Sequence, residues 1–385
     1  MEKESIIIPE YQRDSDQWDK EKKSLFIESV LNNLTVPAFF LAQNETDESV
    51  QDVVDGQQRL TTLRAYYEDT LKLVGSEDAA YLKESVYYPG KKYSEIPKKL
   101  RDTFEGYKLT LIHLPAKIPE ELRLEIFRRI NEGGTPLSAQ DIRLAYYGTC
   151  KSVWFVRLAG VYDSERQGAA RMIETAKTKY GLSWPWSKVG KEVQGEWKNW
   201  WEGRERAMGQ AASEMFLWFI IAKHRNKVNG ILSDENYLRK GLSLAFSGRV
   251  EEVADVACAE LRREDNSEDA RMLCSADEMR DKYFPLFATW WEAILSNIPS
   301  IGVDKSRRLA FLMAGLSWAW KKPVDSLSEE TWELIDQFLK SPRDIDWDGL
   351  GIEYPEAKGK WTGKKGLYAQ IDAIYSFSEA VCKKS

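Results

Sequence analysis

The chain of 385 residues has few of the residues from which zinc sites and disulfide frameworks are built. It contains two histidines and four cysteines, and no cysteine lies in a Cys-x-x-Cys pair or beside a histidine, so we expect buried or free thiols. No apolar run approaches the roughly 18 residues of a membrane-spanning helix. The first residues also lack the basic and then apolar segments of a secretion signal. We therefore expect a cytoplasmic protein without a membrane partner.

Acidic residues outnumber basic ones, which gives a net charge of −6, but the charges are unevenly distributed. Residues 151–228 carry 14 Lys and Arg against 8 Asp and Glu, whereas residues 1–150 and 229–385 are each acidic. Fourteen of the 15 tryptophans also follow residue 150. Because cations neutralise phosphates and aromatic rings stack on bases, the basic segment is a candidate nucleic-acid surface. Its candidate contacts are Lys188, Lys191, Lys198, Arg204 and Trp200. The alternative is a solvated helical face with the tryptophans in a core.

Strand-like and helix-like runs alternate over the first 150 residues, and helical patterns dominate afterwards. We therefore predict an α+β protein with an α/β N-terminal domain at 1–150, a basic Trp-rich helical extension at 151–228 and a helical C-terminal domain at 229–385. One helix is predicted from Gln57 to about Val74. Apolar spacing puts Leu60, Leu63, Tyr67 and Leu71 on its buried face, and Arg59 and Arg64 off that face.

The most informative segment is the one in which the β-branched pair Val53-Val54 meets Asp55-Gly56 and enters that helix. The first amides of a helix have no internal partners and carry the positive end of the helix dipole, so the turn predicts an anion site. Arg59 would add a charged fork for phosphate. The alternative is an ordinary strand-to-helix turn.

Nucleotide hydrolysis requires phosphate clamps, usually a divalent metal, and a group that orients water. We expect Asp55 to bind Mg²⁺ or position the water, and Gln57 or Gln58 to orient the nucleophile. The residues expected to hold the nucleotide and its phosphates are Gln12, Arg13, Gly56, Arg59, Asn131 and Gly134. Alternatively, the arginines and the carboxylate would form a structural ion network, and the loop at 131–134 would be an ordinary turn between helices.

Three blocks in this order carry a family resemblance: Pro-Glu-Tyr-Gln-Arg at 9–13, Asp-Gly-Gln-Gln-Arg-Leu-Thr-Thr-Leu at 55–63 and Arg-Ile-Asn-Glu-Gly-Gly-Thr-Pro-Leu-Ser at 129–138. Together they resemble the GmrSD restriction-enzyme N-terminal domain family, a branch of the ParB/sulfiredoxin-like superfamily. The resemblance implies a ParB-like domain that binds and often hydrolyses nucleoside triphosphates and thereby gates a DNA-directed activity in restriction or anti-phage defence. ParB-like domains often work as dimers, so a homodimer is one candidate, and the sequence leaves the oligomeric state open.

The chain departs from the better-known family members, in which a nuclease domain with a histidine-containing HNH-type motif follows. Neither His113 nor His224 lies in such a motif, so we expect no HNH nuclease here, and we interpret His224 as a cationic helix end. The leading hypothesis is a nucleotide-binding, NTP-hydrolysing regulatory or effector protein of prokaryotic defence. The alternatives are a DNA-binding or DNA-nicking protein that uses the basic segment, and a non-catalytic adaptor with a vestigial nucleotide pocket that recruits a nuclease or another effector.

Overall fold

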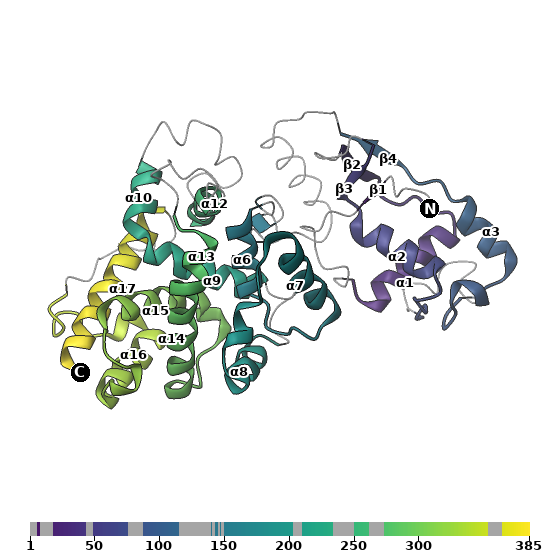
Figure 1. Ribbon diagram of the computed structural model, residues 1–385. Helices are drawn as coiled ribbons and strands as arrows, with labels where there is room; N and C mark the ends of the chain where they lie inside the picture. Colours follow the sequence, from purple (N-terminus) through teal and green to yellow (C-terminus); the bar gives the residue numbers. More distant parts are fainter. Residues whose placement is uncertain are drawn as a thin grey trace. The chain divides into compact units, whose positions relative to one another are not determined.

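A computed structural model describes residues 6–7, 18–43, 49–75, 88–114, 140, 143–144, 147, 150–202, 210–233, 250–261, 273–352 and 364–385 (Figure 1). The chain forms two compact units, Met1–Pro136 and Leu137–Ser385. The first unit is α+β and the second is built from helices, so the predicted fold class is confirmed. Domain limits are predicted at 150 and 228, and the two compact units divide between 136 and 137.

The first unit contains a four-stranded mixed sheet in the order β1-β3-β2-β4. Its strands are β1 (Ile6–Ile7), β2 (Phe39–Gln43), β3 (Gln51–Asp55) and β4 (Leu111–His113). The two central strands are antiparallel, and each edge strand pairs with its neighbour in parallel. The β2–β3 register shifts between Phe40 and Leu41, beside the end of β3 at Asp55. This irregularity adjoins the turn from which the next helix begins.

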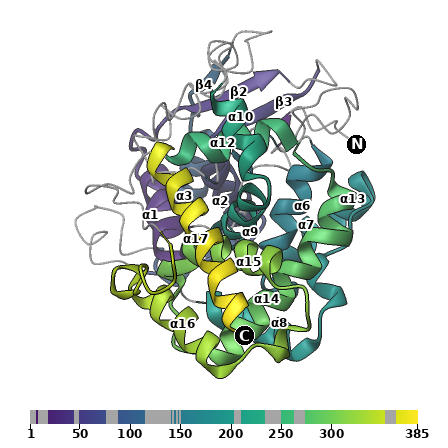
Figure 2. The same ribbon diagram turned by 90° about the vertical axis from the view of Figure 1, so that its left-hand side faces the viewer.

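The described residues of this unit form the α-helices α1 (Lys20–Leu31), α2 (Gln57–Tyr67) and α3 (Lys98–Gly106). Helix α1 begins where the Asp19 carboxylate accepts a hydrogen bond from the Lys22 amide at 2.7 Å. Helices α1 and α2 lie on the same side of the sheet (Figures 1 and 2). A short 3₁₀ turn, η3 (Tyr93–Glu95), precedes α3. The core of the unit is formed by α1, α2 and α3 together with Phe39 of β2.

Helix α2 differs from its prediction in both length and orientation. It ends at Tyr67 rather than near Val74, because Asp69 takes a left-handed conformation (φ 59°) and its carboxylate accepts from the Ser94 amide. Its buried residues are Gln58, Arg59, Thr62 and Tyr66, whereas Tyr67 is 58% exposed. The prediction from apolar spacing was therefore wrong for Tyr67 and Arg59, whereas Leu71 is buried and Leu60 and Leu63 pack against the core.

The second unit is helical. The α-helices that the structure describes there are α6 (Lys151–Ala159), α7 (Gln167–Tyr180), α8 (Lys191–Trp201), α9 (Gln210–Lys223), α10 (Arg225–Ser233), α12 (Val250–Leu261), α13 (Ala276–Glu278), α14 (Phe284–Asn297), α15 (Ser306–Ala319), α16 (Glu329–Lys340) and α17 (Lys364–Lys384). Short turns of 3₁₀ helix are η4 (Pro185–Lys188), η7 (Val303–Lys305), η8 (Val324–Ser326) and η9 (Pro342–Asp344), and η6 (Met279–Tyr283) is a π-helical turn between α13 and α14. Helix α15 packs against both α9 and α17 (Figure 2).

One apolar core runs through the second unit, from Leu144 to Cys382. Residues 151–228 and 229–385 both contribute to it, so the two helical segments distinguished in the sequence share a core. Helix α15 is buried on nearly all its faces, which is typical of a central helix. It approaches α17 closely at Gly315, where a β-carbon would lie 2.5 Å from the Ser378 hydroxyl. Most of the tryptophans lie in this core, as the structural alternative predicted.

Candidate functional site

The candidate anion site lies where β3 ends and α2 begins. Gly56 is the N-cap residue of α2 and has φ 102°, a conformation that favours glycine. The Gly56 carbonyl accepts the first hydrogen bond of the helix, from the Leu60 amide at 2.9 Å. A glycine has no side chain, so Gly56 provides no side-chain hydrogen-bond acceptor for the amides of the first turn. The turn thus has the strand–glycine–helix geometry that the sequence predicted.

Phe39 fixes the turn from the neighbouring strand. A β-carbon on Gly56 would lie 2.4 Å from Cδ1 of the Phe39 ring, which is fully buried. Glycine is therefore required twice, once by the backbone conformation and once by the ring. Nothing in the Asp-Gly pattern alone identifies this ring, because Phe39 precedes Gly56 by 17 residues and reaches it only through the pairing of β2 with β3.

Arg59 is buried beneath the turn and is 9% exposed. Its Nη2 forms an ion pair with Asp55 Oδ2 at 2.5 Å, and its Nη1 donates to the carbonyls of Pro37 and Ala38. The guanidinium carbon also lies 4.9 Å from the centre of the Phe39 ring. These contacts tie the first turn of α2 to the start of β2. They form the structural ion network that was the alternative to a direct phosphate contact.

The remaining polar residues of the turn differ in accessibility. Gln57 is half-buried, whereas Gln58 is 8% exposed and lies on the inward face with Arg59. Asp55, the expected metal ligand, has a partly exposed side chain and one oxygen engaged by Arg59. Within the described part of the chain, no group of three or more His, Cys, Asp or Glu side chains could hold a metal ion.

Five residues expected at functional sites lie outside the described residues: Gln12, Arg13, Asn131, Gly134 and Arg204. The structure brings together the other members of the candidate nucleotide site, which are Asp55, Gly56, Gln57, Gln58 and Arg59. Sequence reasoning missed Phe39 and the two carbonyls that Arg59 contacts. No local signal identifies a carbonyl acceptor, since every residue carries one.

The candidate nucleic-acid contacts differ in their burial and in their partners. Trp200 is 6% exposed and its indole donates to the Ile301 carbonyl at 3.0 Å, so it belongs to the core and offers no face to a base. Lys198 pairs with Asp163 at 3.0 Å, which raises the pKa of the lysine. Lys188 and Lys191 are exposed. The expectation of base stacking at Trp200 is thus corrected, because tertiary packing buries its ring.

The interpretation of His224 as a cation is also corrected. Its side chain is half-buried between α9 and α10 and stacks edge-on against Tyr283. Burial, with a further contribution from Lys227, lowers its pKa to about 4. The imidazole is therefore neutral near pH 7, and its Nε2 is buried without a hydrogen-bond partner among the described residues.

A buried ionic cluster in the second unit was not predicted. Arg143 is 1% exposed and its Nε donates to Asp255 Oδ1 at 2.7 Å. Its Nη1 donates to Gln140 Oε1 at 3.2 Å and lies 3.6 Å from Glu214 Oε1. The cluster joins the segment around Gln140 to α9 and α12. Its partners are up to 112 residues apart in sequence, so spacing gave no sign of it.

The chain is thus a two-unit protein, in which an α+β unit with a strand–glycine–helix turn is followed by a helical unit. Residues 1–148 match the family model described as GmrSD restriction endonuclease, N-terminal domain. This part of the chain is thus a GmrSD-type N-terminal domain, as its three sequence blocks indicated, and the match indicates a restriction-type defence protein. No curated protein and no solved structure matches the chain. No helix among the described residues has the length and apolar character needed to cross a membrane.

Proposed function

We propose that the first unit is a nucleotide-binding module of a restriction-type defence protein, which holds the phosphates of a nucleoside triphosphate at the N-terminus of α2. Binding or hydrolysis of that nucleotide would gate a DNA-directed activity supplied by an effector partner. The observation that carries the proposal is the Gly56 turn, which delivers β3 into a helix whose N-cap residue has no side chain. A helix N-terminus of this kind favours anions through its amides and its dipole.

Each residue of the turn has a role in this proposal. Gly56 lets the backbone take the φ of 102° at which β3 turns into α2, and Gln57, the more accessible glutamine, orients the attacking water. Arg59 acts as a positioning residue, because its contacts with Asp55, Pro37 and Ala38 hold the first turn of α2 in place. A displaced first turn would misdirect the amides that bind phosphate.

Mg²⁺ would enter with the nucleotide, because this ion keeps several waters and is commonly held by substrate phosphates and one or two carboxylates. Asp55 is a carboxylate of that kind, at the end of β3 and beside the start of α2. Bound Mg²⁺ would neutralise charge on the phosphates during transfer. Asp55 would thus serve both the metal and Arg59.

The test uses the purified full-length chain and the variant Gln57→Glu. A carboxylate in the first turn of a helix interacts favourably with the helix dipole. The variant should therefore unfold at the same temperature as the wild type or at a slightly higher one. The same carboxylate repels phosphate. We expect at least a tenfold loss of affinity for the preferred nucleotide among ATP, GTP, CTP and UTP with Mg²⁺, and a loss of phosphate release, measured with and without duplex DNA.

The matched control is Lys98→Gln on α3, which makes the same change of one unit in net charge at an exposed position. It should leave affinity and turnover unchanged. Two outcomes would show that the phosphates are not held at α2. In the first, the wild type binds none of the four triphosphates. In the second, Gln57→Glu binds as tightly as the wild type while Lys98→Gln also has no effect. Binding without turnover in the wild type would instead support the adaptor alternative.

A further inference from the structure

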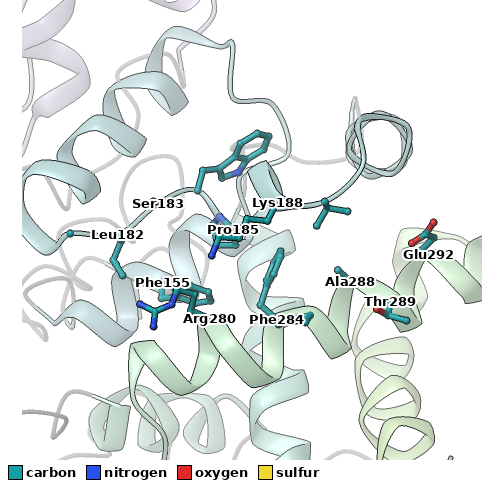
Figure 3. Close-up of a pocket in the computed structure, with 14 residues that line it drawn as sticks. Phe155, Leu182, Ser183, Pro185, Lys188, Arg280, Phe284, Ala288, Thr289 and Glu292 are labelled. Carbon is teal, nitrogen blue, oxygen red and sulfur yellow. The ribbon is translucent and has the colours of Figure 1, made fainter. Parts of the chain in front are cut away.

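The second unit contains a pocket of about 500 Å³, a volume ordinary for small-molecule sites. Its residues come from α6, the segment 181–189 and the helical stretch formed by η6 and α14. Figure 3 shows Arg280 and Phe155 at one end, Thr289 and Glu292 at the other, and Phe284 and Lys188 between them. The pocket lies entirely within the second unit.

The walls of the pocket are held by internal hydrogen bonds. The indoles of Trp184 and Trp186 donate to the carbonyls of Val161 and Ala159, at 3.0 and 2.7 Å, which fixes the segment containing η4 to the end of α6 and the chain just after it. On the other side, Arg280 lies in the π-helical turn η6 and is clamped by two carboxylates, at 2.7 Å to Asp277 and 2.6 Å to Asp281. π-Helical turns occur frequently at functional sites. The cavity is therefore preformed.

The floor is apolar and partly aromatic. Phe155, Leu182, Phe284 and Ala288 line it and are all buried, and the half-buried ring of Trp184 stands beside them. An apolar floor with aromatic side chains favours a planar ring, which loses little conformational freedom on binding and packs on those side chains.

The polar groups at the rim include one cation and one carboxylate that are not paired. Neither the side chain of Lys188 nor that of Glu292 forms an ion pair or hydrogen bond with a residue that the structure describes. The pKa of Asp281 is lowered mainly by Arg280 and further by Lys188. Hydroxyl groups of Ser183 and Thr289 complete the rim.

We propose that this pocket binds a free nucleotide whose base carries an exocyclic amino group, with its phosphate at Lys188 and the amino group at Glu292. Lysine binds phosphate as a point charge, and glutamate accepts hydrogen bonds from exocyclic amines of bases. Phe284 and Glu292 both line the pocket and are separated by eight steps along α14, a rise of about 12 Å, which accommodates a base, a sugar and one phosphate. The site is independent of the proposed triphosphate site at α2.

The experiment measures binding of AMP, CMP, UMP, adenosine and ribose 5-phosphate to the full-length chain by calorimetry. We expect AMP and CMP to bind at least tenfold more tightly than UMP, and ribose 5-phosphate not to bind. Lys188→Gln should weaken AMP binding about tenfold and leave adenosine unaffected. Glu292→Gln should remove the preference for amino-bearing bases, because an amide is a weaker acceptor than a carboxylate.

Two controls locate the site. Lys191→Gln removes an exposed lysine that lies near Lys188 in the sequence but outside the pocket, and this variant should bind AMP as the wild type does. Gln57→Glu, which addresses the α2 turn, should also leave AMP binding unchanged. Loss of AMP binding in Gln57→Glu but not in Lys188→Gln would overturn the proposal, as would absence of AMP and CMP binding in the wild type. Binding of single-stranded oligoadenylate without binding of AMP would overturn the free nucleotide as the ligand.

Discussion

Replacing Gly56 with alanine tests the geometry on which the α2 site depends. Two costs add at this position. An alanine at φ 102° is strained by about 1–2 kcal/mol, because its β-carbon crowds the following carbonyl. The β-carbon would also lie 2.4 Å from Phe39 Cδ1, and the ring is buried, so it can move only by disturbing the core. Overpacking of this kind costs typically about 1–3 kcal/mol. The expected loss of stability in the first unit is therefore about 2–5 kcal/mol.

Gly90→Ala provides the matched control, because Gly90 lies in the same unit, has φ 73° and has no atom within 4 Å of the place that a β-carbon would occupy. It should lose only the conformational part, about 1–2 kcal/mol. Hydrogen–deuterium exchange of peptides covering β2 and α2 measures the opening free energy of this unit separately from the helical unit. Equal losses for Gly56→Ala and Gly90→Ala would refute the overlap with Phe39. A second variant, Phe39→Leu, should reduce the extra cost of Gly56→Ala in the double mutant.

Two further predictions concern the helical unit. Because His224 has a pKa of about 4 when folded and 6.5 as an ordinary side chain, the unfolded state binds its proton first on acidification. The free energy of unfolding should fall by about 3 kcal/mol in total as pH falls from about 6.5 to about 4. In urea unfolding at a series of pH values, His224→Gln should lack this part of the dependence on pH. An identical pH dependence in the variant would contradict the assignment. Arg143→Met should cost about 3–5 kcal/mol, because it leaves Asp255 as a buried charge without its main partner. The double variant Arg143→Met/Asp255→Leu should recover part of that loss in the same assay, and a loss equal to the sum of both single variants would show that the two residues are not coupled.

Local patterns predicted the elements that local forces specify. The Asp-Gly pair after a β-branched run predicted the turn into α2, and the structure shows an equally local contact at the start of α1, where Asp19 caps the helix. The helical character of the second unit was also predictable, because it follows from apolar spacing along each helix. The burial of Trp200 agrees with the general tendency of tryptophan in helices to lie in a core, and the candidate role in base stacking failed for that reason.

The inward face of α2 could not be predicted, because burial there depends on partners distant in sequence. Apolar spacing placed Tyr67 inside and Arg59 outside, but the carbonyls of Pro37 and Ala38 and the carboxylate of Asp55 satisfy the arginine and allow it to be buried. With those acceptors present, Arg59 is buried in α2 together with Gln58, Thr62 and Tyr66.

The family of the N-terminal domain, the α+β class and the glycine turn could all be predicted from the amino-acid sequence, because blocks of adjacent residues and short-range backbone preferences encode each of them. Three other features depend on long-range packing: Phe39 closes over Gly56, Arg143 meets Asp255 in a core, and Lys188 and Glu292 border one pocket. In each case the contact joins residues from separate segments of the chain. Neither their partners nor their degree of burial is encoded by the residues next to them in the sequence.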